Sequence, residues 1–381
     1  MRKMFLGWWC EEVDDLWLWC LALACEKCGV TLHQATRVGN HYHIMFTVSE
    51  ENLGDFFRWL NRSLSSGLKA LLRRHGYAAP DEIFDGQGTH AMRLLDAEAQ
   101  LAHLVYERVN CVQAGLAATC DTAPGGNLPL GYWKTGGRRV KKPEGLFPGE
   151  SAELHLPMAP PALAYLGAGG DVESLLHHIG RMERICEREI GKLRGPARTA
   201  SEVRSIDPWS EPKTWKDERG SAPCFKTRLG KEARTRAARE VRAWRRAYRD
   251  AATRWRSGER DVAFPHGTYQ MRRMFGVEVA EPGADSWVSA PGLTLAEARE
   301  CVHERDPSLM DRVQASVLEA LRETEMVEAE AERDDRTSDA DDEPSSRPSA
   351  PDHHRSSLEI GRPGTGSVPT RPTGDRDPPR D

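Results

Sequence analysis

The chain has 381 residues, of which 39% are hydrophobic and 29% are charged, so it can bury a sizeable core and is not a mini-protein. A formal net charge of -5, taken alone, argues against a polyanion partner. The charge is uneven, however. Residues 323–381 contain 16 acidic and 8 basic residues, which leaves 42 acidic and 45 basic residues and a charge of +3 in the first 322.

Nine cysteines are scattered through helix-like stretches. An odd number without framework spacing is typical of reduced thiols in a cytoplasm. The longest apolar stretch near the N-terminus, Leu16–Ala24, is too short to cross a bilayer and follows acidic residues rather than a basic region. We therefore expect a cytoplasmic protein without a signal peptide or a membrane segment.

The first half of the chain begins with a helical pattern and continues with two strand-like runs. Apolar residues at helical spacing predict a helix over Cys10–Lys27, which Gly29 ends. Val30–Arg37 and His41–Val48 are rich in β-branched and aromatic residues, and the turn residues between them predict a β-hairpin.

Two further apolar stripes predict helices over about 51–74 and about 96–118. The order helix, strand, strand, helix, helix predicts an α+β domain over residues 1–120. Residues 121–150 are rich in Gly, Pro and basic residues, which predicts a linker.

The second half has two predicted parts. Residues 151–322 carry amphipathic stripes and predict a mostly helical unit of unknown role, while residues 323–381 have few apolar residues and predict a disordered acidic tail. Within the helical unit, residues 226–260 hold 13 basic and 4 acidic residues interleaved with Trp and Tyr. Such a run can track a DNA backbone and stack bases, or it can be a solvated helix whose aromatic residues pack inward. The candidate DNA contacts are Arg239, Arg242, Arg245 and Arg246.

The sharpest local feature is His41-Tyr42-His43, at the start of the second predicted strand. Because side chains alternate along a strand, His41 and His43 share a face, about 7 Å apart, and can converge on one cation. Paired histidines in strands are more often ordinary surface or hydrogen-bonded residues. Cys25 and Cys28 form a CxxC nearby, but no second CxxC completes a zinc site.

The predicted helix over 96–118 carries Tyr106 and Asn110, four residues apart and therefore on one face. Tyr106 can supply a phenolic nucleophile and Asn110 an amide oxygen for a metal. The simpler interpretation is a half-buried tyrosine beside a polar helix residue.

Together these residues resemble a known family. The segment Val30–Leu60, with Asn40-His41-Tyr42-His43, looks like the HUH segment of single-tyrosine transposases, and most closely that of the REP-associated tyrosine transposases. Residues 106–115 resemble the tyrosine helix of that family, in which Tyr is followed by Asn four residues later and then by Ala-Gly. The resemblance covers roughly residues 5–120 and rests on two motifs in matching order and spacing.

The resemblance implies a ferredoxin-like antiparallel sheet with helices, and a DNA transposase that cuts and rejoins single-stranded or hairpin DNA through a 5'-phosphotyrosine. It implies Tyr106 as nucleophile and His41, His43 and Asn110 as ligands of Mg²⁺ or Mn²⁺. The chain departs from the family at Cys111, where Pro is usual, at Gln113, where Arg is usual, and in having only Met1–Leu6 before the first helix.

Two other functions stay open at this point. A rolling-circle nickase shares the histidine pair, although the Tyr placed four residues before Asn favours the transposase. A domesticated DNA-binding protein without catalysis is the other alternative, although the presence of both histidines, Tyr106 and Asn110 argues against it.

Overall fold

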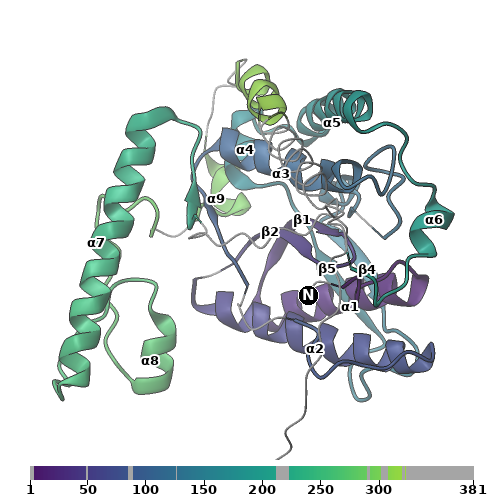
Figure 1. The fold of residues 1–381 in the computed structure, drawn as a ribbon. Helices are drawn as coiled ribbons and strands as arrows, with labels where there is room; N and C mark the ends of the chain where they lie inside the picture. The colour runs from purple at the N-terminus through teal and green to yellow at the C-terminus, as the bar shows by residue number, and fades with distance from the viewer. Residues whose placement is uncertain are drawn as a thin grey trace, which may run out of the picture. The chain divides into compact units, whose positions relative to one another are not determined.

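The computed structural model (Figure 1) describes most of the chain up to residue 322, in the ranges 4–48, 50–84, 89–125, 127–211, 223–289, 292–301, 308–319 and 322. The predicted acidic tail, residues 323–381, lies outside the described residues.

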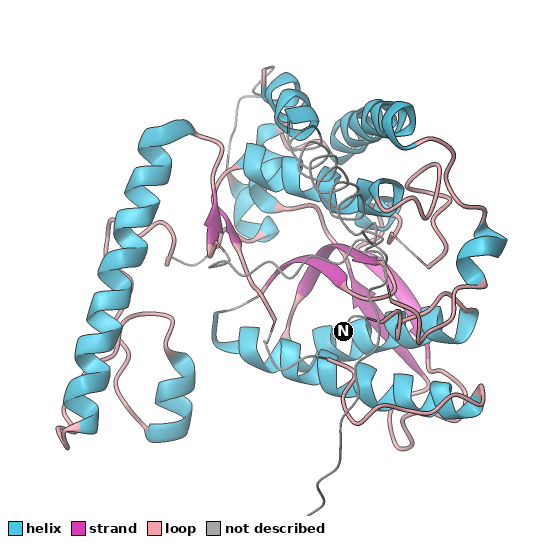
Figure 2. Ribbon diagram, in the orientation of Figure 1, coloured by secondary structure: helices cyan, strands magenta, loops and turns pink. Residues whose placement is uncertain are grey.

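The described chain is a mixture of many helices and a few short strands (Figure 2), which confirms the predicted α+β class. The helices are α1 (Glu11–Cys28), α2 (Leu53–Arg74), α3 (Ala97–Gln113), α4 (Ala162–Gly167), α5 (Val172–Arg194), α6 (Ala200–Arg204), α7 (Gly230–Arg256), α8 (Tyr269–Phe275) and α9 (Leu295–Glu300), with 3-10 turns η1 (Glu50–Asn52) and η2 (Leu130–Trp133). The strands are β1 (Thr31–Arg37), β2 (Tyr42–Thr47), β3 (Arg93–Leu94), β4 (Gly137–Lys141), β5 (Glu153–Pro157) and β6 (Phe225–Lys226).

The predicted first helix and the hairpin after it are confirmed. α1 ends at Gly29, which adopts a left-handed conformation (φ +62°) that glycine tolerates without strain. β1 and β2 pair antiparallel, with Thr36 opposite His43. In the turn between them, Gly39 (φ +80°) leaves no room for a side chain, since a Cβ there would lie 2.6 Å from the Trp9 ring.

The two faces of this hairpin are covered by different helices. Tyr42 points to the side of α1 and α2, because its ring lies 5.3 Å from that of Trp17 and its hydroxyl donates to Asn61 Oδ1 at 2.6 Å. Thr36, which pairs with His43, turns to the other face, where α3 lies. Figure 1 shows α1 and α2 on one side of β1 and β2, and α3 on the other. Because side chains alternate along β2, Tyr42 packs against helices on one face and His43 lies on the opposite face.

The segment predicted as a linker, residues 121–150, contains strand β4, which pairs antiparallel with β5. A parallel bridge between Leu32 and Met158 attaches β1 just beyond the end of β5. One hydrophobic core extends from Leu6 to Val317 and includes residues of α1, α2, α3 and α5. The predicted boundaries at residues 120 and 150 do not coincide with a break in this core.

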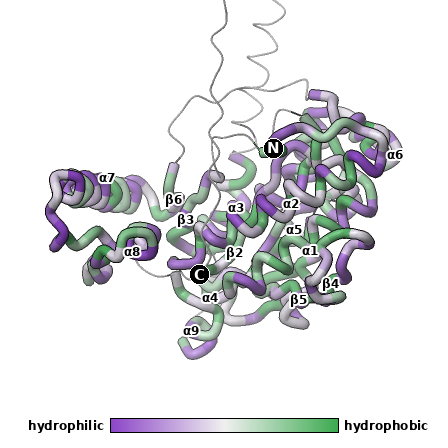
Figure 3. Tube along the Cα trace, turned by 90° about the horizontal axis from the view of Figure 1, so that it is seen from below, coloured by the Kyte–Doolittle hydropathy of each residue, from purple (hydrophilic) through white to green (hydrophobic). Residues whose placement is uncertain are grey.

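The region of α7 and α8 has a small core of its own. Ala251, Ala252, Val262, Phe264 and Val277 are buried together there. Hydrophilic residues are frequent along α7 (Figure 3), and only three of its residues are buried. Across the described residues, no helix combines the length and the apolar character needed to cross a membrane.

Candidate active site on the histidine strand and the tyrosine helix

The rings of His41 and His43 are neighbours. Their centroids lie 5.0 Å apart and their planes are nearly perpendicular, at 87°. His41 Nδ1 lies 2.7 Å from the side-chain oxygen of Asn40. A proton on Nδ1 that is donated to this oxygen leaves the lone pair of His41 Nε2 for a metal, which is the tautomer that outer-shell partners of metal-bound histidines impose.

Both histidines are held in the neutral form that a metal ligand requires. Part of the His41 side chain reaches solvent, yet the surrounding protein desolvates the ring and, with the nearby His43, lowers the pKa of His41 to about 3. Desolvation also lowers the pKa of His43, although the carboxylate of Glu107 opposes this shift. At neutral pH neither imidazole has to lose a proton before it binds a cation.

His43 lies opposite Thr36, whose side chain reaches α3 through Asn127. The charges of His103 and Glu107 on that helix also influence the pKa of His43. The Tyr106 ring lies nearly parallel to that of His103, with centroids 6.1 Å apart. His103, Tyr106, Glu107 and Asn110 follow the spacing of three, four and seven residues that places side chains on one helix face. The face of the hairpin that carries His43 is therefore the face that α3 covers, and α3 also carries Tyr106 and Asn110.

α3 is shorter than predicted, and its ends explain its position. Asp96 caps its N-terminus by accepting a hydrogen bond from the backbone of Ala99 at 2.7 Å. It ends at Gln113 rather than near residue 118, because Gly115 (φ +66°) turns the chain out of the helix. Tyr106 and Asn110 both lie inside the regular part of α3.

Glu107 is a member of this site that the sequence patterns did not reveal. Its side chain is 2% exposed, and one carboxylate oxygen lies 3.2 Å from His103 Nε2. Among the described residues, nothing hydrogen-bonds its other oxygen, nor His103 Nδ1, nor His43 Nε2. Buried polar atoms without partners are costly and commonly mark a place for a ligand, an ion or water. The only sequence signal was the spacing of four residues between His103 and Glu107.

Imidazole nitrogen and amide oxygen are donor types that divalent cations accept. Among the described residues, His43 Nε2 is buried and has no hydrogen-bond partner, and the contact of His41 Nδ1 with Asn40 leaves His41 Nε2 as the second candidate donor. Asn110 carries the candidate amide oxygen. Oxygen donors suit both Mg²⁺ and Mn²⁺, and Mn²⁺ accepts imidazole nitrogen more readily than Mg²⁺ does.

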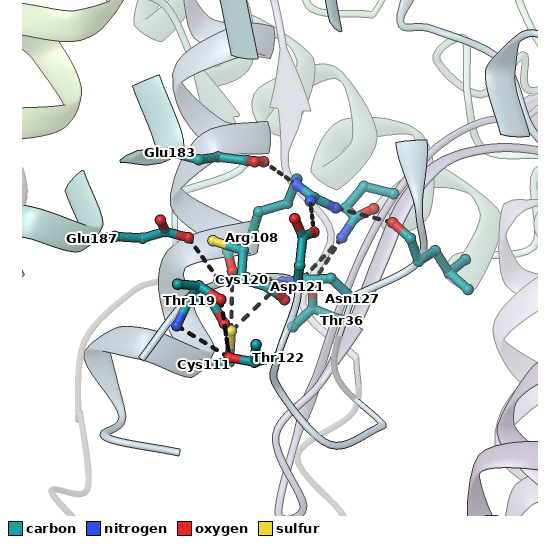
Figure 4. A network of polar contacts seen from close by, with 12 residues as sticks. Thr36, Arg108, Cys111, Thr119, Cys120, Asp121, Thr122, Asn127, Glu183 and Glu187 are labelled. Atoms are coloured by element: carbon teal, nitrogen blue, oxygen red, sulfur yellow. Dashed lines mark hydrogen bonds and ion pairs between the residues drawn. The ribbon is translucent and has the colours of Figure 1, made fainter. Parts of the chain in front are cut away.

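One asparagine fixes α3 against the sheet (Figure 4). The side-chain amide of Asn127 donates to the backbone oxygens of Arg108 (2.8 Å) and Cys120 (3.2 Å). Its oxygen accepts hydrogen bonds from Gln34 and Thr36 of β1. Thr36 of β1 lies opposite His43 of β2. Asn127 therefore connects β1, at the position next to His43, to the turn of α3 that contains Tyr106.

A buried ion pair holds the same turn of α3 to α5. The guanidinium of Arg108 pairs with Glu183 and donates to the backbone oxygen of Leu128 at 3.0 Å (Figure 4). Arg108 is 3% exposed and Glu183 is 8% exposed. α5 belongs to the unit predicted to be separate, so α3 is positioned from both sides of the predicted linker.

On the basic helix α7, the predicted arginines and the predicted aromatic residues differ in their exposure. All four candidate arginines, Arg239, Arg242, Arg245 and Arg246, are exposed. The aromatic residues instead pack inward. Trp244 stacks on Tyr248 with ring centroids 5.6 Å apart and donates to the His266 backbone, and Trp255 meets Phe264. Of the two alternatives for these aromatic residues, the structure shows the inward packing, because their rings have protein partners.

A second cationic feature was not predicted. A pocket of about 380 Å³ lies where the end of α1 meets the first half of α2. Trp59 lines it and is 38% exposed. Its charged lining residues are Lys27, Asp55, Arg58, Arg62 and Arg273. The excess of positive charge around an exposed indole suits a nucleic-acid strand.

Comparison with family models, with curated proteins and with solved structures finds no match to this chain.

Proposed function

We propose that this chain is a metal-dependent single-tyrosine DNA transposase that cuts and rejoins single-stranded or hairpin DNA. The observation that supports it most is the placement of the His41 and His43 pair beside α3, the helix that carries Tyr106 and Asn110. This chemistry requires a nucleophile close to a bound metal ion. Here the pair of candidate metal ligands and the candidate nucleophile lie on neighbouring elements of the fold.

The proposal assigns the residues as follows. His41, His43 and Asn110 hold Mg²⁺ or Mn²⁺, with Glu107 as the buried carboxylate beside them. When bound, the cation offsets the charge of the scissile phosphate. The proposed arrangement is the ferredoxin-like HUH fold, for which the β1–β2 hairpin between α1/α2 and α3, and the bridge from β1 to Met158, are the supporting features.

Tyr106 is the proposed nucleophile. Its phenolic oxygen attacks phosphorus, a 5'-phosphotyrosine bond forms, and the bond to the 3'-oxygen breaks and leaves a 3'-hydroxyl. The phenolic proton passes to solvent as the new bond forms, and solvent returns a proton to the departing 3'-oxygen. A second 3'-hydroxyl reverses the step at a new junction without ATP, because the phosphotyrosine conserves the phosphodiester energy.

The DNA partner is proposed from charge. The exposed arginines of α7 and the cationic pocket around Trp59 provide two surfaces for phosphates. An exposed indole beside guanidinium groups can stack an unpaired base, which favours a single strand over a duplex.

The test is a covalent adduct assay. We expect the full chain, incubated with labelled single-stranded DNA and Mn²⁺, to form a denaturant-resistant protein–DNA adduct. Tyr106→Phe should bind DNA but form no adduct, whereas the control Tyr77→Phe should react like the wild type. His41→Ala and His43→Ala should lower Mn²⁺ affinity by at least about 10-fold, the loss that changes in outer-shell residues alone produce. An adduct that persists in Tyr106→Phe would overturn the assignment.

A further inference from the structure

A second cluster of metal-binding side chains lies where the start of α1 meets the end of α2. Cys10, Glu12 and His75 each offer one ligand atom there, and these atoms all lie within 4.8 Å of one another. None of the three belongs to the histidine strand or to α3. The described residues contain no other such group of three His, Cys, Asp or Glu side chains.

The fold sets the cluster in place through helix termini. Cys10 precedes α1, Glu12 lies in its first turn, and His75 directly follows α2. His75 is fixed twice, because its backbone N–H donates to Leu71 and its ring meets the edge of Trp8 with centroids 5.8 Å apart. The three side chains therefore converge because α1 and α2 pack side by side.

Glu12 is prepared as a ligand. One of its oxygens accepts a hydrogen bond from Arg74 at 2.8 Å, and the other meets His75 Nε2. An ordinary glutamate is a carboxylate at neutral pH, and Arg74 is a cationic partner for it. The hydrogen bond between Glu12 and His75 shows that the two side chains already point at a common place.

We propose that Cys10, Glu12 and His75 form a zinc site, with a water molecule as the fourth ligand. Sulfur, nitrogen and oxygen donors in one cluster are the set that Zn²⁺ accepts, while Mg²⁺ avoids thiolate. In a tetrahedral site with bonds of about 2.0–2.3 Å, ligand atoms lie about 3.3–3.8 Å apart. The three ligand atoms lie within 4.8 Å of one another, so side-chain movement has to bring them to this spacing when the metal binds.

Binding of the metal releases one proton, that of the Cys10 thiol. The thiol of Cys10 is free, and a free cysteine thiol carries its proton at neutral pH. Zn²⁺ takes the thiolate, the neutral imidazole and the carboxylate, and the thiol proton passes to solvent. His75 is exposed and the other two side chains are half-buried, so the metal has access.

The site would fasten the start of α1 to the end of α2. A ligand that binds only the folded chain stabilises it by mass action, so zinc should raise the unfolding temperature. The proposal is independent of the transposase chemistry. The ligand residues, the preferred metal and the secondary-structure elements that carry the ligands all differ from those of the site around His43.

Cobalt is the probe that reports the sulfur ligand. The full chain, stripped with a chelator and titrated with Co²⁺, should bind one equivalent with a thiolate-to-cobalt charge-transfer band and the intense visible bands of a tetrahedral site. One equivalent of Zn²⁺ should remove these bands. Cys10→Ser should abolish the charge-transfer band, and His75→Ala should weaken binding at least about 10-fold.

Matched variants separate this site from its competitors. Cys28→Ser tests the CxxC, Cys301→Ser tests an exposed cysteine, and His43→Ala tests the proposed catalytic cation; each should retain the band. A band that survives in Cys10→Ser but disappears in Cys28→Ser would overturn the proposal. Zinc should also raise the unfolding temperature of the wild type but not of Cys10→Ser, and an equal rise in both would contradict the site.

Discussion

The tyrosine helix α3 and the basic helix α7 carry their candidate functional residues in opposite ways. Around α3, several polar groups are buried and held by specific partners, such as Arg108 with Glu183 and the side chain of Asn127 with β1 and α3. Along α7, the candidate arginines are exposed, and the helix is anchored by aromatic residues on a small core.

This difference matches what each task requires. Attack on phosphorus requires a nucleophile fixed relative to the cation, so the helix that carries it must not move against the sheet. Contact with phosphates requires positive charge at the surface and tolerates mobile side chains. Variants in α3 should therefore act through stability and geometry, while variants in α7 should act through charge.

The largest effect is expected at the buried ion pair. Arg108→Met leaves Glu183 buried without its partner and should lower the free energy of unfolding by about 3–5 kcal/mol. Urea denaturation measures it. The control is Arg139→Met, which breaks an exposed pair with Glu153 and should cost no more than about 1 kcal/mol. Equal losses in the two variants would remove the distinction between the buried site and the surface.

A smaller effect should appear as acid sensitivity around the sheet. His33 is buried. Its Nδ1 lies 2.8 Å from Ala159 O, and its Nε2 lies 2.8 Å from Thr47 Oγ1. Burial lowers the pKa of His33 to about 4. In the unfolded chain the His33 imidazole takes up a proton at about pH 6.5, whereas in the folded chain it does so only near pH 4. The free energy of unfolding is therefore unaffected by His33 above about pH 6.5 and falls by about 3 kcal/mol in total as the pH drops towards 4.

Chemical denaturation at pH 7 and at pH 4.5 measures this loss. His33→Gln keeps a donor and an acceptor but does not titrate, so the difference in unfolding free energy between the two pH values should shrink. The control His155→Gln changes an exposed histidine and should leave the difference unchanged. A full acid response in His33→Gln would place its origin elsewhere.

The smallest effect, and the one that tests α7, is a change in salt dependence. Replacing Arg239, Arg242, Arg245 and Arg246 with Gln should weaken DNA binding and flatten the plot of log affinity against log salt concentration, by about 0.7 for each lost phosphate contact on a single strand. Stability should not change, because all four side chains are exposed. A slope identical to that of the wild type would assign DNA binding to the α3 region and the Trp59 pocket alone.

Local patterns predicted the first half of the fold well. The helical stripe with Gly29 and the two strand-like runs around Gly39 correspond to α1, β1 and β2, because each depends on neighbouring residues. Alternation also placed His41 and His43 side by side. These features needed no long-range information.

The parts that sequence could not predict depend on contacts distant along the chain. The strand β4 forms only by pairing with β5, and its Gly-rich and basic surroundings suggested a linker. Glu107 joins the site because the packing of α3 on the sheet buries it near His43. Asn127 is one polar residue in a loop, and only the fold brings it to β1 and α3 at once.

The most direct measurement of the central proposal is to identify the residue joined to DNA. The full chain is incubated with labelled single-stranded DNA, once with Mn²⁺ and once with a chelator; the trapped adduct is digested, and the modified peptide is sequenced by mass spectrometry. The account predicts a phosphotyrosine at Tyr106 that forms only with the metal. Modification of a different residue, or an equal yield in the chelator, would contradict it.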